Sequence, residues 1–204
     1  MTRTASLRAA GLIGALVLVP AAARAQATVG QPAPAFSAPD QTGATRSLDA
    51  YKGKWVVLEC VNHECPFVKK HYGSGNMQKL QKNYTAKGVV WLSVNSTNRN
   101  HAEYSTGARM TAWMQQQGGA PKAVLIDDTS ATGRAYAART TPHMFVIDPA
   151  GKIVYAGAID DKRSANPADI KTSVNHVAVA LGELGAGKAV TRASTAAYGC
   201  TIKY

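Results

Sequence analysis

Hydrophobic and polar positions follow two regular patterns over most of this chain. Short apolar runs bounded by turn residues are typical of buried strands, and apolar positions three or four apart are typical of amphipathic helices. The strand-like runs cover residues 54–61, 89–94, 123–127, 144–148 and 153–157. Helices are predicted over residues 66–71, 77–86 and 129–138, and around Met110 and Met114. The alternation of the two patterns predicts an α/β fold with a mixed sheet and helices on both faces.

Turn and breaker residues refine this picture. Residues 149–152 (Pro-Ala-Gly-Lys) separate the last two strands and predict a hairpin. Residues 26–40 contain three prolines and are expected to be extended, and residues 47–51 are expected to form a capped turn. A terminal amphipathic helix is predicted from apolar residues at helical spacing: Ile170, Val174, Val177, Leu181 and Leu184. No periodicity marks residues 191–204.

The first 25 residues have the features of a secretory signal peptide. Arg3 and Arg8 form a basic region, residues 9–19 are apolar, and Ala23-Arg24-Ala25 is a small-x-small cleavage site. We expect cleavage near Ala25, with Ala27 as the alternative end of the site, and a periplasmic or secreted protein. The apolar stretch is shorter than the roughly 20 residues of a membrane span, although an uncleaved anchor stays an alternative. The remaining residues, 26–204, are expected to form one domain with a C-terminal tail at 186–204.

Charge and composition argue against nucleic acid as a partner. The net charge of +11 falls to +8 when the three arginines of the signal peptide are removed. The remaining basic residues are spread along the chain and belong to no nucleic-acid-binding motif.

The three cysteines occupy different settings. In an exported protein disulfides persist, but three cysteines are too few and odd in number for a disulfide-stapled fold. Cys65 follows a predicted strand and precedes Pro66, a residue favoured at the first position of a helix. Unpaired N–H groups and the helix dipole at that position favour a thiolate, which is the reactive form of cysteine. Cys65 is therefore the predicted nucleophile, whereas Cys60 is interpreted as a small core residue.

Three motifs carry a family resemblance. They are Asn62-His63-Glu64-Cys65-Pro66-Phe67-Val68-Lys69-Lys70, Thr141-Pro142-His143-Met144-Phe145-Val146-Ile147-Asp148 and Tyr198-Gly199-Cys200-Thr201-Ile202-Lys203-Tyr204. Together they resemble thioredoxin-fold redoxins of the alkyl hydroperoxide reductase/thiol-specific antioxidant family, in a peroxiredoxin-like subgroup with one active-site cysteine. The resemblance covers roughly residues 29–204. It implies a thioredoxin-like fold and an oxidoreductase that reduces peroxide or disulfide substrates without a metal or organic cofactor, supported by an external thiol reductant.

The resemblance also assigns roles to individual residues. It implies a cis peptide bond before Pro142, with the backbone of Thr141 pairing to an extended substrate; Asn62 and Pro66 complete the expected substrate-binding set. Glu59 lies six residues before Cys65, where thioredoxins carry a buried acid, and a buried carboxyl suits a proton acceptor. The alternative is a Glu59 that is exposed at an edge or paired with a cation such as Lys54.

Cys200 is the natural resolving thiol under this resemblance. A sulfenate on Cys65 can condense with a second thiol, and we expect a reversible Cys65–Cys200 disulfide. This requires the tail to fold back over the active site. The alternatives are a static structural bridge or a buried free thiol.

The chain also departs from the family patterns. Val68 replaces the second cysteine of a Cys-x-x-Cys pair, and Leu58 and Asn62 stand where peroxiredoxins present Pro and Thr. Arg134 or Arg139, or the nearer Lys69 and Lys70, could replace the arginine that activates a peroxidatic cysteine; each could equally be an ordinary surface charge.

Two other function classes stay open from the sequence. His63, Cys65, His71 and His143 could gather at a copper site, although the Cys-x-x-x-Cys pair of thioredoxin-fold copper chaperones is absent. A catalytically silent fold used for protein binding is the third hypothesis.

Overall fold

The computed structural model describes Met1 and residues 27–204, and its central feature is a five-stranded mixed sheet. The strands lie in the order β5-β4-β3-β7-β8. Their bounds are Ala123–Ile126, Val90–Asn95, Val56–Cys60, His143–Ile147 and Ile153–Gly157, in the same order. β3, β4 and β5 are parallel, and β7 and β8 are antiparallel to their neighbours. The α/β fold and the hairpin are confirmed, whereas the expected signal peptide and its cleavage site near Ala25 lie outside the described residues.

β3 occupies the middle of the sheet and leads to Cys65. Every residue of this strand is buried, because both faces of the sheet are covered. Glu59 lies opposite Ser93 of β4 and opposite Met144 of β7. The neighbouring Cys60 points to the other face, since side chains alternate along a strand.

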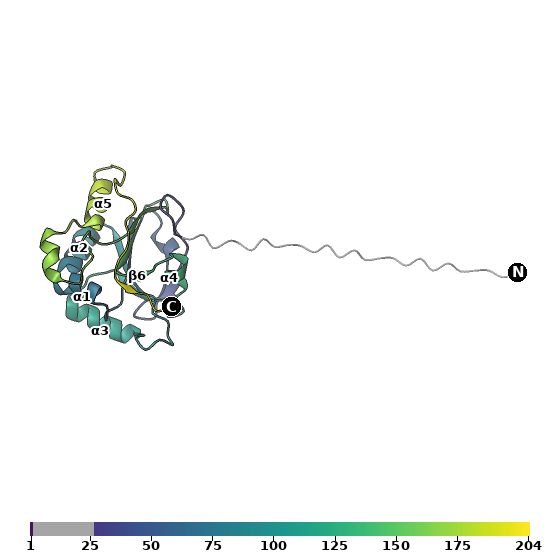
Figure 1. Ribbon diagram of the computed structural model, residues 1–204. Coiled ribbons are helices and arrows are strands. Elements are labelled where there is room, and N and C mark those ends of the chain that lie inside the picture. Colours follow the sequence, from purple (N-terminus) through teal and green to yellow (C-terminus); the bar gives the residue numbers. More distant parts are fainter. Residues whose placement is uncertain (2–26) are drawn as a thin grey trace.

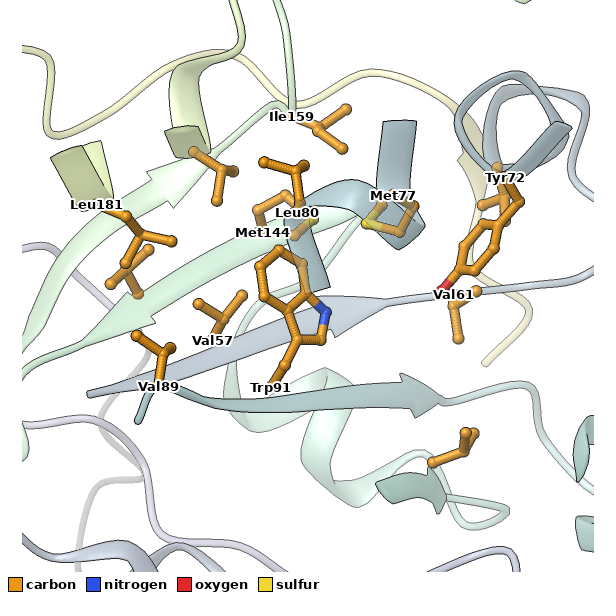
Figure 2. Close-up of a cluster of buried hydrophobic side chains, with 14 of the residues drawn as sticks. Val57, Val61, Tyr72, Met77, Leu80, Val89, Trp91, Met144, Ile159 and Leu181 are labelled. Atoms are coloured by element: carbon orange, nitrogen blue, oxygen red, sulfur yellow. The ribbon is translucent and has the colours of Figure 1, made fainter. Parts of the chain in front are cut away.

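Four helices cover one face of the sheet (Figure 1). They are α1 (Pro66–Gly73), α2 (Asn76–Thr85), α3 (Gly107–Gln117) and α5 (His176–Gly185). Figure 2 shows Trp91 of β4 in the middle of the buried side chains on this face, with Leu80 from α2 beside it and Tyr72 from α1 farther along the sheet, beyond Met77. Gly75, with φ +74°, caps α2 and marks the predicted interruption between α1 and α2.

The other face is covered by shorter elements. They are β1 (Ser37–Pro39), β2 (Thr45–Ser47), the 3-10 helix η1 (Leu48–Tyr51), α4 (Ala131–Ala135) and part of the C-terminal tail. Phe36 of the N-terminal segment, Tyr136 after α4 and Ile202 of the tail are buried here. The turn expected at residues 47–51 is η1, although the Ser47 side chain makes no capping hydrogen bond.

The predicted terminal helix divides into two elements. A 3-10 helix, η2, spans Pro167–Thr172, the backbone at Ser173 is extended, and α5 starts only after Asn175. The Asn175 side chain accepts a hydrogen bond from the backbone N–H of Ala178 and thereby caps α5. The expectation that Ile170 and Val174 belong to this helix was wrong, and Val174 is 50% exposed.

The C-terminal tail returns to the centre of the molecule through a short strand pair. β6 (Thr140–Thr141) pairs antiparallel with β9 (Cys200–Thr201), and Figure 1 places β6 beside the end of the chain. Two-residue strands carry no periodicity, so the sequence pattern could not reveal them. Over residues 27–204, no helix is both long enough and apolar enough to cross a membrane.

Candidate active site

Cys65 lies at the junction between β3 and α1. It occupies the N-cap position of α1, Pro66 follows at the first helical position, and the Cys65 N–H donates to the carbonyl of Asn62. The residue is only 3% exposed. This is the placement that the apolar run, the polar turn and the Cys-Pro step predict.

Thr141 provides the contact on the opposite side of Cys65. The Thr141–Pro142 peptide bond is cis, as expected from the resemblance. The Cys65 thiol donates to the carbonyl oxygen of Thr141, with 3.1 Å between Sγ and O. The Thr141 hydroxyl is buried and has no hydrogen-bond partner within the described part of the chain.

Cys200 reaches the same place from the end of the chain. It lies opposite Thr141 in the β6–β9 pair. Burial, followed by a hydrogen bond to Cys65 and the electrostatic interaction with it, raises the pKa of the Cys200 thiol to about 12. The two cysteines are therefore neighbours, and both are free thiols in this structure.

Gly199 makes this approach of the tail possible. Its φ is +138°, and a Cβ built on it would lie 2.0 Å from the carbonyl oxygen of Thr141. Only glycine fits such a backbone conformation this close to another strand. The Gly-Cys step in the tail is thus a structural requirement of the site.

Cys60 is separated from this pair. It is buried among the side chains on the opposite face of the sheet, with Leu58 and Tyr136 in the same cluster. Burial raises the pKa of its thiol. This environment agrees with its interpretation as a core residue.

Glu59 is completely buried beneath the site. Its carboxylate accepts hydrogen bonds from four neutral donors, which are Tyr72 Oη at 2.8 Å, Gln81 Nε2 at 3.1 Å, Trp91 Nε1 at 2.8 Å and Ser93 Oγ at 3.0 Å. Burial raises the pKa of Glu59, although these four bonds partly oppose the shift. Glu59 is therefore neither exposed at an edge nor paired with Lys54. It connects to α1 through Tyr72 rather than through a direct bond to Cys65.

The loop before Cys65 is fixed by its own polar side chains. The Asn62 side-chain oxygen Oδ1 accepts from the Glu64 N–H at 2.8 Å, and its side-chain Nδ2 donates to Glu103 at 3.0 Å. Glu64 forms ion pairs of 3.1 Å with Lys69 and with Arg109. Asn62 thus shapes the turn that presents Cys65.

The basic residues considered as activators of Cys65 have other partners. The Arg134 guanidinium lies 4.6 Å from the centre of the Tyr204 ring, and Lys69 pairs with Glu64. Arg139 lies near His143, where its charge and above all burial lower the histidine pKa to about 4. Lys70 is buried and pairs with Asp160.

The histidines considered for a metal site lie in separate environments. His63 contacts Ser105 and Glu64, His71 contacts Asn76, and the His143 ring packs against Phe145. Residues 27–204 contain no group of three or more His, Cys, Asp or Glu side chains placed to hold a metal ion.

One cluster near the site was not predicted from the sequence. Lys70, Asp160 and Tyr198 form a buried polar cluster that joins α1, the segment after β8 and the tail. Lys70 and Tyr198 belong to motifs noted above, but no spacing rule relates either to Asp160. Only the folded arrangement reveals the cluster.

The fold and the site define the class of this protein. A mixed sheet, a cysteine at the start of the first helix and an adjacent cis-proline are those of a thioredoxin-fold redoxin, and the protein is an oxidoreductase. The chain belongs to the AhpC/TSA family, which matches residues 29–156.

Solved structures of similar proteins agree with this assignment. An uncharacterized conserved protein from Geobacillus kaustophilus is 27% identical, with a TM-score of 0.74 over 87% of this chain and 92% of its own. A hypothetical protein from Sinorhizobium meliloti 1021 is 26% identical, with a TM-score of 0.72 over 87% of this chain and 94% of its own. A putative thiol:disulfide interchange protein DsbE from Chlorobium tepidum is 26% identical, with a TM-score of 0.52 over 64% of this chain and 85% of its own. No curated protein shows significant sequence similarity to the chain.

Proposed function

We propose that this protein is an exported thiol-dependent redox enzyme that reduces peroxide or disulfide substrates through Cys65, with Cys200 as the resolving thiol. One observation carries the proposal. Cys65 donates to the carbonyl of Thr141, and Cys200 lies opposite the same residue, so a single backbone position holds both cysteines together.

With a peroxide substrate, two successive displacements account for all atoms. The Cys65 thiolate attacks one oxygen, the O–O bond breaks, and the sulfur becomes a sulfenic acid. The leaving oxygen takes up a proton, equivalent to the one that Cys65 lost on ionisation, and departs as an alcohol or water. The Cys200 thiol then attacks the Cys65 sulfur, and the S–O bond breaks as an S–S bond forms and water leaves. An external dithiol returns both cysteines to the reduced state.

With a disulfide substrate, the same two sulfurs act in the same order. The Cys65 thiolate attacks one substrate sulfur and releases the other as a thiolate, which leaves a mixed disulfide on Cys65. Cys200 then attacks the Cys65 sulfur and releases the second substrate thiol. The chain thereby performs with distant cysteines what a Cys-x-x-Cys pair performs with adjacent ones.

The electrostatics of Cys200 suit a thiol that acts second. Its raised pKa has burial as the largest cause, but the next two causes both come from Cys65. When Cys65 has reacted, its negative charge is gone, and the pKa of Cys200 falls. The two contributions from Cys65 thus oppose ionisation of Cys200 before the first step and not after it, while burial acts throughout.

Neighbouring groups have supporting roles in this proposal. Thr141 and Pro142 form the substrate-binding side of the site, and the Thr141 hydroxyl, which has no hydrogen-bond partner among residues 27–204, can bond a substrate oxygen or sulfur. Asn62 and Pro66 shape the turn and the helix start that present Cys65. Glu59, whose pKa is raised by burial, accepts a proton by way of the Tyr72 hydroxyl. Tyr72 lies on α1, the helix that begins directly after Cys65.

Export and disulfide chemistry fit together in this proposal. The N-terminal sequence pattern is that of a signal peptide, and exported compartments allow disulfides to form. One neighbour of similar fold is a putative thiol:disulfide interchange protein. Recovery from a bacterial periplasm of a protein beginning at Gln26 would support export, and recovery of the uncleaved chain would contradict it.

The test treats the reduced protein with peroxide and, separately, with a small disulfide, followed by non-reducing peptide mapping. We expect a Cys65–Cys200 linked peptide, loss of turnover in Cys65→Ser, and a stalled Cys65 adduct in Cys200→Ser. Both thiols remaining free after oxidation would overturn the proposal. Catalytic consumption of peroxide or of disulfide, with a dithiol as reductant, distinguishes the two substrate classes.

A further inference from the structure

Lys70, on α1 five residues after Cys65, has a fully inaccessible side chain. Its ammonium lies 3.1 Å from Asp160 Oδ2, 2.8 Å from the carbonyl oxygen of Lys162 and 3.2 Å from the Tyr198 hydroxyl. A lysine has three N–H donors, so all of them are used. Buried lysines are rare unless paired, and this one needs an explanation.

The partners of Lys70 come from two other parts of the chain. Asp160 and Lys162 follow β8, whereas Tyr198 belongs to the tail. The Tyr198 hydroxyl accepts from Lys70 and donates to Asp160, so both of its hydrogen-bonding roles are filled. The cluster is therefore complete only when the tail is in place.

The charges within this cluster balance without a third ionised group. His71 Nε2 lies 3.8 Å from Asp160 Oδ2, but burial lowers the pKa of His71 to about 4. At neutral pH the histidine is uncharged, and Lys70 and Asp160 neutralise each other. The Tyr198 hydroxyl of the tail thus bonds to both members of an ion pair and not to a lone charge.

Tyr198 is separated from Cys200 by a single residue. That residue is Gly199, whose backbone lies against the Thr141 carbonyl too closely for any other side chain. The Tyr198 ring also packs edge-on against Phe67 of α1, with ring centres 5.8 Å apart. On the other side of Cys200, the buried Ile202 donates its N–H to the carbonyl of Arg139 at 3.1 Å. Cys200 is thus held between two fixed points.

We infer that Lys70, Asp160 and Tyr198 form a clamp that positions Cys200 for attack on Cys65. This inference rests on the proposed exchange between the two cysteines. Disulfide formation requires a narrow range of Cα separations and dihedral angles, so it depends on where the tail is held. The first attack by Cys65 on a substrate does not need the tail, and the clamp acts on the second step alone.

A purely structural role would be served as well by apolar residues. Buried ion pairs contribute little more to stability than well-packed apolar groups of similar volume, but they can specify one arrangement. Here the arrangement specified is that of the tail. Lys70, Asp160 and Tyr198 are positioning residues, since none of them touches the reacting sulfurs.

The experiment separates the two chemical steps with an aromatic disulfide, dithiobis(nitrobenzoate), whose released thiolate is coloured. Attack by Cys65 releases one equivalent and leaves a mixed disulfide; attack by Cys200 on the Cys65 sulfur releases the second. In Tyr198→Phe, which keeps the ring contact with Phe67 and loses the hydroxyl, we expect the first phase not to be slowed. The second phase should slow by about tenfold or more, as expected for loss of a hydrogen bond to a charged group.

One control and a second test variant accompany Tyr198→Phe. Tyr84→Phe removes a hydroxyl that donates to the Ala178 carbonyl at 3.0 Å, a bond that involves none of Lys70, Asp160 and Tyr198, and should leave both phases unchanged. The double variant Lys70→Met/Asp160→Asn removes both charges without leaving one unpaired, and should also slow the second phase selectively. This second route keeps the test valid if one variant folds poorly.

The outcomes are distinguishable. A second phase as fast as in the unmodified protein, or an equal slowing of both phases, would overturn the clamp. Release of one equivalent by the unmodified protein, as expected for Cys200→Ser, would instead overturn the proposed function and with it this inference.

Discussion

Thr141 and Cys200 lie opposite each other in the β6–β9 pair, while the Thr141 carbonyl accepts a hydrogen bond from Cys65. The backbone that the resemblance assigns to an extended substrate is therefore occupied by the protein's own tail. An extended peptide must displace β9 before it can pair with Thr141. A small substrate need only reach the Cys65 sulfur.

Removal of the tail should open this strand edge. We expect a chain ending at Ala197 to form a mixed disulfide with an extended cysteine-disulfide peptide several-fold faster than full-length Cys200→Ser does. Both proteins lack the resolving thiol, so their difference reports the tail alone. Mass spectrometry of the adduct over time measures the rates, with circular dichroism as the check on folding. Equal rates would show that β9 does not obstruct the edge.

Gly199→Ala should disturb the approach of the tail to Thr141. The added Cβ would lie 2.0 Å from a backbone oxygen, at a φ of +138°. We expect the free energy of unfolding to fall by about 1–3 kcal/mol and the Cys65–Cys200 bond to form more slowly. Urea denaturation and non-reducing gels measure the two effects.

Gly43→Ala is the matched control for this change. Gly43 also has a positive φ, +87°, but its Cβ would meet nothing within 4 Å. It should lose stability through backbone strain while disulfide formation stays unchanged. A slowing of disulfide formation in both variants would contradict the specific role of Gly199.

Thr141→Val tests the buried hydroxyl beside the two cysteines. An unsatisfied buried hydroxyl costs about 1–3 kcal/mol, so replacing it with a methyl group should leave stability unchanged or raise it. If the hydroxyl bonds the substrate, KM should rise several-fold. Steady-state kinetics and thermal unfolding measure these quantities. A fall in stability with unchanged KM would argue against the substrate role.

Glu59→Gln separates proton transfer from packing. Burial raises the pKa of Glu59, so the charged form destabilises the folded state, and stability of the unmodified protein falls as pH rises through the ordinary glutamate range. The variant should lose this part of the pH dependence and be at least as stable at neutral pH. We also expect slower turnover with a changed pH profile. Unaltered turnover would assign Glu59 to structure alone.

His71 should make the protein sensitive to acid. Its pKa is lowered from 6.5 to about 4 by burial, so the unfolded state binds the extra proton between these values. Stability is full above pH 6.5 and falls as pH drops toward 4, by about 3 kcal/mol for this group. His71→Gln should reduce that decline in denaturation measured at several pH values. The decline should not vanish, because His143 has a similarly lowered pKa.

Local rules predicted the parts of the site that are close in sequence. An apolar strand, a polar turn and a Cys-Pro step placed Cys65 at the start of α1, and strand alternation placed Glu59 and Cys60 on opposite faces. The cis peptide before Pro142 came from the family motif rather than from any local rule.

The remaining parts depend on contacts between distant segments. The donors to Glu59 come from α1, α2 and β4, and no sequence pattern relates them. The prediction from apolar spacing alone started the terminal helix too early, at Ile170. Ile170 in the 3-10 helix η2 and the exposed Val174 continue the helical spacing of apolar residues although neither belongs to α5. The β6–β9 pair is too short to leave a pattern.

Cys65 and Cys200 are neighbours in the folded protein but lie 135 residues apart in the sequence, and their bond would enclose the strands β4 to β8 and the helices α1 to α5. Closing a ring of that size restricts the unfolded chain and raises resistance to unfolding by about 5 kcal/mol in the loop-entropy model. The oxidised protein, with its disulfide formed, would then resist unfolding better than the reduced one. Each round of reduction would therefore return a protein that unfolds, and is cleaved by proteases, more readily.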